Sequence, residues 1–67
     1  MKFLRLHHVK AMTGLSRSTI YRYAKQGIFP VPAKVGLRSI AWVEAEVLAW
    51  IAERISERDQ SISVAAG

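Results

Sequence analysis

The chain has 67 residues, no cysteine and a formal net charge of +5. A chain this short forms one small domain, and without cysteine it has neither a disulfide framework nor a thiolate metal site. Residues 1–42 contain eight Lys and Arg and no acidic residue, whereas residues 43–67 contain two Arg and five acidic residues, and this polarised charge points to nucleic acid or an anionic membrane as partner.

The N-terminal segment predicts a short strand and a first helix. Residues 3–6, FLRL, alternate weakly between apolar and polar side chains, and the apolar residues between Leu6 and Leu15 then follow an irregular helical spacing. Gly14 suits the left-handed conformation that ends a helix, so we expect a helix of about two turns before it. Charged residues and histidines interrupt the first ten residues too often for a signal peptide, and no stretch is long enough to span a membrane.

A second helix is predicted from Arg17 to Gln26, with Ser16 as its N-cap and Gly27 as its stop. The few residues that separate the two helices allow them to cross as a helix-turn-helix. At about 100° per residue, one side of this helix is apolar and consists of Ile20, Tyr23 and Ala24. The opposite side is cationic and aromatic, and it consists of Ser18, Tyr21, Arg22 and Lys25.

The segment after Gly27 predicts a hairpin. Pro30 and Pro32 exclude a helix and hold the chain extended. The runs AKV and SIAW then flank GLR, with Gly36 free to adopt a positive φ at the turn. The tip of this hairpin carries Lys34 and Arg38.

The C-terminal part predicts a third helix and a tail. From Val43, apolar residues recur every three or four positions, and the glutamates fall outside that stripe. Trp42 and Trp50 lie within the apolar pattern and are expected to anchor the core. We therefore predict a mainly α fold with a small β-hairpin, a winged helix-turn-helix of three helices plus a wing over residues 1–59, followed by a flexible tail over residues 60–67.

The order of these motifs resembles the AlpA family of phage and prophage regulators, which belongs to the MerR-like winged-helix group together with many excisionases. The resemblance covers residues 4–55, and it depends on TGLSRSTIYR, GIFPVP, the GLR turn, and Trp42 followed by EVLAWI. It implies a DNA-binding domain of phage or mobile-element origin that acts as a transcriptional regulator, an excisionase, or both, at promoter or attachment-site DNA. Regulators of this family often activate an integrase gene, and the excisionases bend attachment-site DNA.

The resemblance also implies roles for individual residues. The wing role is carried over to Arg38, and the recognition-helix roles are carried over to Ser16, Arg17, Ser18, Thr19, Tyr21 and Arg22. The sequence departs from the family pattern at His7 and His8, where acidic or long polar residues are common, and at Ala45. None of these three positions belongs to the expected DNA face.

Each of these residues also has a possible structural role. The second helix has no acid for intrahelical pairs, which favours DNA contact over a solvated charged face. Arg17 and Arg22 can bond bidentately to guanine, while short hydroxyl side chains and helix N–H groups allow close approach to a phosphate. Tyr21 falls at the border of the buried side, so packing and phosphate contact both remain open. Lys34 and Arg38 either keep the hairpin soluble or contact phosphate or the minor groove, and the tight tip favours contact.

We expect no catalytic site, metal site or cofactor. His7 and His8 are adjacent, so on a helix their side chains diverge, and no third ligand clusters with them. The expected partner is double-stranded DNA, with cooperative self-association on it and an integrase or recombinase as a further partner, in a cytoplasmic, nucleoid-associated protein. The alternative is a basic interaction module that docks an acidic protein.

Overall fold

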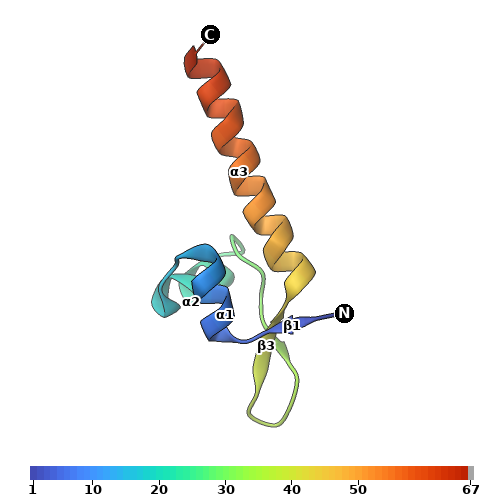
Figure 1. Ribbon diagram of the computed structural model, residues 1–67. Coiled ribbons are helices and arrows are strands. Elements are labelled where there is room, and N and C mark those ends of the chain that lie inside the picture. The colour runs from blue at the N-terminus through green and yellow to red at the C-terminus, as the bar shows by residue number, and fades with distance from the viewer. Residues whose placement is uncertain (67) are drawn as a thin grey trace.

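The computed structural model describes residues 1–66, and side chains are described as far as residue 61. Figure 1 shows two short helices and a small sheet gathered at the base of one long helix. The elements in chain order are β1 (Phe3–Leu4), α1 (Leu6–Thr13), α2 (Arg17–Lys25), β2 (Ala33–Lys34), β3 (Ile40–Val43) and α3 (Glu44–Ala66). The sheet has three antiparallel strands in the order β1-β3-β2. The predicted mainly α fold with a small hairpin is confirmed.

The ends of α1 and α2 follow the predicted capping residues. Gly14 ends α1 with φ 73°, and its N–H donates to the Lys10 carbonyl. The hydroxyl of Ser16 caps α2 by accepting the Thr19 N–H at 3.2 Å. Gly27 follows α2 with φ 76°, and the N–H groups of residues 27 and 28 return to carbonyls of the last turn, as in a Schellman motif.

The core lies where the sheet meets the three helices. Its fully buried side chains are large and apolar, and Trp42 on β3 is the largest of them. The indole N–H of Trp42 donates to the Pro30 carbonyl at 3.1 Å, so the extended proline segment closes one side of the core. The predicted anchoring role of Trp42 is confirmed, whereas Trp50 is half-buried and packs edge-on against Phe29. The buried core residues are Leu4, Val9, Ile20, Phe29, Ala41, Trp42 and Val47.

The hairpin of β2 and β3 projects from the opposite end of the molecule to the C-terminus (Figure 1). Ala33 pairs with Ala41 and Lys34 with Ile40, and the Val35 N–H donates to the Ser39 carbonyl at 2.9 Å. Gly36 does not take the positive φ that the sequence suggested, since Gly14 and Gly27 are the only described residues in that region. A positive φ at the first turn residue is required by the two-residue turns of types I′ and II′, and the connection between β2 and β3 is longer than two residues.

Helix α3 continues well beyond the body of the domain (Figure 1). It runs to Ala66, past residue 59, where the sequence suggested that the domain ends. Much of the predicted tail, residues 60–67, lies outside the residues whose side chains are described, so its flexibility stays a prediction. Helix α2 ends one residue earlier than predicted and β1 is two residues shorter than the predicted strand. Over residues 1–66, no helix has both the length and the hydropathy to cross a bilayer.

Candidate nucleic-acid interface

The N-terminus of α2 presents free backbone donors beside a capped turn. The Ser16 hydroxyl accepts the Thr19 N–H and donates to the Thr19 hydroxyl at 2.9 Å, so both side chains are occupied in holding the turn. The N–H groups of Arg17 and Ser18 have no hydrogen-bond partner among the described residues. The Ser18 side chain is exposed, and its hydroxyl forms no hydrogen bond with the described residues. Two N–H groups and one hydroxyl at a positive helix end can together bind an anionic oxygen.

Tyr21 connects the core to the exposed face of α2. Its ring is half-buried and meets Trp42 edge-on, with 5.9 Å between the ring centroids. The guanidinium carbon of Arg17 also lies over that ring, 5.5 Å from its centroid. Of the two roles left open for Tyr21, packing is therefore observed. The ring also holds Arg17 in one region of space, which reduces the entropy that this side chain loses when it binds a ligand.

Arg22 and Lys25 continue the exposed face along α2. The Arg22 guanidinium lies 5.5 Å from the ring centroid of the half-buried Tyr23, and Lys25 is exposed in the last turn. The buried residue of this helix is Ile20, on its other side. The structure thus brings Arg17, Ser18, Arg22 and Lys25 to the surface of one helix, while Ser16 and Thr19 hold its first turn.

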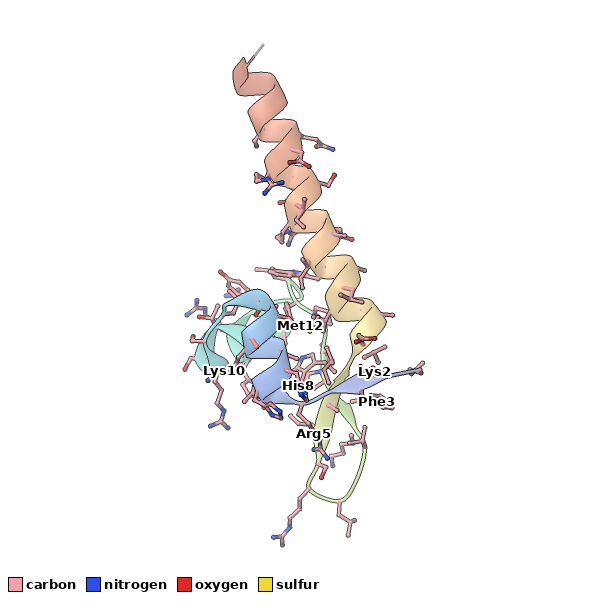
Figure 2. The ribbon with its side chains drawn as sticks, in the orientation of Figure 1. Lys2, Phe3, Arg5, His8, Lys10 and Met12 are labelled. Atoms are coloured by element: carbon pink, nitrogen blue, oxygen red, sulfur yellow. The ribbon has the colours of Figure 1, made fainter. Side chains whose placement is uncertain are left out.

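The hairpin adds a second basic surface. Lys34 and Arg38 are exposed on its two sides, and Arg5 donates to the Ile40 carbonyl at 3.5 Å. Figure 2 shows Arg5 close to the base of the hairpin. Sequence reasoning did not select Arg5 as a site residue, because it precedes α1 and reaches the hairpin only through the pairing of β1 with β3.

A further basic side chain outside the predicted set is Lys10. It lies on α1, where Figure 2 labels it, and it is exposed. The sequence feature that could have indicated Arg5 and Lys10 is their position in the half of the chain that contains no acidic residue. That position alone does not show whether either side chain lies on the same surface as α2.

The ion pairs of the described residues lie on α3 and at its junction with the N-terminus. Lys2 lies 3.7 Å from Glu44, while Arg54 and Arg58 pair with acids of α3 itself. Among the described residues no other Lys or Arg lies within ion-pair distance of a carboxylate. The cations that have no ion-pair partner within the described part of the chain are Arg5, Lys10, Arg17, Arg22, Lys25, Lys34 and Arg38. They lie on or next to α1, α2 and the hairpin, so the molecule carries its uncompensated charge on these elements.

Other kinds of site are not seen in the described chain. The rings of His7 and His8 lie 4.0 Å apart, but no three His, Cys, Asp or Glu side chains of residues 1–66 lie close enough together to form a metal site.

Two shallow grooves lie along α3. One lies against the Gly27–Val31 loop and the other against the end of α1, and apolar side chains line most of both.

Comparison with known proteins points to phage regulators. The family model described as Prophage CP4-57 regulatory protein (AlpA) matches residues 2–55. Uncharacterized protein ORF88 of Enterobacteria phage P4 is 46% identical over 57 residues, which cover 85% of this chain and 65% of that protein. The DNA-binding transcriptional activator AlpA of Escherichia coli (strain K12) is 33% identical over 60 residues, which cover 81% of this chain and 86% of that protein. The match therefore spans just under two thirds of the phage P4 relative and most of the activator.

Proposed function

Because the chain belongs to the AlpA family of prophage regulatory proteins, we propose that it is a sequence-specific DNA-binding regulator of phage or mobile-element type. The observation that carries this proposal is the positive charge on α1, α2 and the hairpin, which forms no ion pair among the described residues. Cations that lack internal partners repel one another, and a polyanion such as duplex DNA relieves that repulsion and releases its own counterions on binding. Relatedness to a DNA-binding activator supports the same proposal.

In the proposed complex α2 enters the major groove. Its N-terminus binds a backbone phosphate through the N–H groups of Arg17 and Ser18, and the Ser16 and Thr19 hydroxyls support that turn. Arg22 and Arg17 are the candidates for bidentate bonds to guanine. Tyr21 acts mainly as the ring that positions Arg17, and Lys25 binds phosphate electrostatically.

The hairpin contacts the DNA beside the α2 site in this proposal. Lys34 and Arg38 lie against the backbone or the adjacent minor groove, where positive side chains are favoured by the concentrated negative potential. Their exposure and lack of acidic partners among the described residues support this role over a solubilising one. Arg5, at the base of the hairpin, extends the same surface.

The regulated DNA is a promoter, an attachment site, or both. Transcriptional activation and excision require the same fold and the same basic surface, so an integrase or recombinase is a natural partner for either role. A protein with this function resides in the cytoplasm with the nucleoid. We expect no catalytic activity and no cofactor in any of these roles.

Several copies are expected to bind together. A single module of this size buries about 600–1,000 Å² of protein surface on DNA, which gives limited specificity. We propose that the acidic residues on α3 of one copy face the basic elements of the next, so that adjacent sites fill cooperatively. The separation of charge between α3 and the rest of the chain supports this arrangement.

The experiment that tests the proposal is selection of bound duplexes from a randomised DNA pool. A recovered motif establishes sequence-specific binding, and the repeat pattern within it reports the arrangement of copies. Direct repeats indicate head-to-tail binding, whereas inverted repeats indicate a two-fold dimer. Recovery of random sequence at physiological salt would contradict sequence-specific binding.

The competing function is that of a basic module that docks an acidic protein, which the same unpaired cations allow. Competition separates the two functions. If protein is the true ligand, then duplex DNA does not displace an acidic partner from the α2 surface.

A further inference from the structure

The outermost part of the hairpin carries an apolar side chain that the fold does not use. Leu37 is 99% exposed, the highest value among the large hydrophobic residues described, and it lies between Gly36 and Arg38. It belongs neither to the buried core nor to the side chains that pack against the core. A leucine that does not pack against the core, at the end of a basic projection, is placed to contact something outside the protein.

The shape of the tip suits a narrow site. The hairpin is closed by the Val35 N–H bond to the Ser39 carbonyl, just before the tip. Gly36 adds no side chain next to Leu37, and a Cβ at that position would already lie 3.4 Å from the Ser39 Cβ. The minor groove of B-DNA is about 6 Å wide, which is too narrow for a pair of strands with their side chains, so only the tip of the hairpin can enter it. A tip this slim with one projecting side chain fits that groove better than a broad loop does.

We propose that Leu37 is a wedge that inserts between two base pairs from the minor groove and kinks the duplex. The inference rests on the proposed DNA-binding function, and it names a residue and a deformation that the basic surface alone does not require. Lys34 and Arg38 provide the attraction to the groove, and Leu37 provides an apolar surface for the unstacked base pairs. Apolar side chains inserted in this way kink DNA by about 20–90°.

The wedge affects DNA shape more than affinity. Unstacking a base step is unfavourable, whereas removing the leucine side chain from water is favourable, so the two contributions oppose each other. Shortening Leu37 is therefore expected to change affinity for a single site by less than about tenfold, and to remove the kink. Flexible pyrimidine–purine steps are the easiest to unstack, so the wedge favours sites with such a step beside the α2 contact.

The test uses a duplex that contains the motif recovered by selection, with donor and acceptor dyes at its ends. In parallel duplexes, 2-aminopurine replaces one adenine at a time on the side expected to face the hairpin, and its fluorescence rises where a base unstacks. With the unmodified protein we expect shorter end-to-end distance and a fluorescence rise at one step. Leu37→Ala loses both signals, and Leu37→Met, which keeps a long apolar side chain, retains them.

Leu48→Ala is the matched control, because Leu48 is also an exposed leucine but lies on α3. It keeps both signals. Unchanged bending and unstacking in Leu37→Ala would overturn the wedge while leaving DNA binding intact, and absence of any binding to the duplex would refute the proposed function itself. If Leu37→Ala keeps the single-site bend but weakens binding of a second copy to a two-site duplex, then Leu37 contacts the neighbouring copy and the wedge is wrong.

Discussion

Replacement of Arg22 by alanine tests the assignment of α2 as the base-reading helix. The side chain makes no ion pair with the described residues and contacts mainly the Tyr23 ring, with 5.5 Å between the guanidinium carbon and the ring centroid. Removing this side chain lowers the free energy of unfolding by no more than about 1 kcal/mol, and alanine forms helices at least as well as arginine. If Arg22 bonds bidentately to a guanine, binding to the selected site weakens by about 1–3 kcal/mol, which is roughly 5- to 150-fold.

The assay is fluorescence anisotropy with the selected duplex and with a scrambled duplex of equal length and composition. A base contact lowers affinity for the selected duplex more than for the scrambled one. Arg58→Ala is the matched control, because it also removes one positive charge but lies on α3 and pairs with Asp59 at 2.8 Å. Equal losses on both duplexes would limit Arg22 to phosphate contact. A loss no larger than that of Arg58→Ala would refute a contact between Arg22 and DNA.

Three further predictions concern the charged surface and the two ends of α2. If about five basic residues contact phosphates, log affinity falls with log salt concentration at a slope near −4.5, and a flat titration would contradict DNA binding. Ser16→Ala removes the cap and lowers the free energy of unfolding by about 1 kcal/mol, or about 4–8 °C in Tm, whereas Ser18→Ala leaves thermal unfolding nearly unchanged. Gly27→Ala places a side chain on a residue at φ 76° and therefore lowers the midpoint of urea unfolding, while Gly36→Ala changes that midpoint little. Similar shifts for both variants would contradict a role for the left-handed conformation of Gly27.

The helices were predictable because their signals are local. Ser16, Gly14 and Gly27 act on neighbouring backbone groups, and their capping geometry is as the sequence indicated. The conformation of Gly36 was not predictable, because it depends on the register of the hairpin, which sequence alone left undefined. Pairing of Lys34 with Ile40 leaves a loop long enough to turn without a left-handed glycine.

The surface residues were harder to assign than the helices that carry them. A helical projection leaves Tyr21 at the border because the angle of a residue says nothing about what faces it. The structure settles its packing through Trp42, which comes from β3 and lies far along the sequence. Leu37 was placed in the GLR turn but given no role, because the sequence does not show whether a hairpin projects from the body or folds back against it.

The distribution of ion pairs connects folding to the proposed function. Pairs within α3 compensate its own Arg residues, and they leave the cations of α2 and the hairpin without acids nearby in the described structure. Mutual repulsion among those cations destabilises the compact state, and salt screens it. DNA relieves the same repulsion but loses affinity as salt rises. Added salt is therefore expected to raise the stability of the free protein and to lower its affinity for DNA through the same side chains. A purely solubilising surface would show the rise in stability without any salt-dependent binding to DNA.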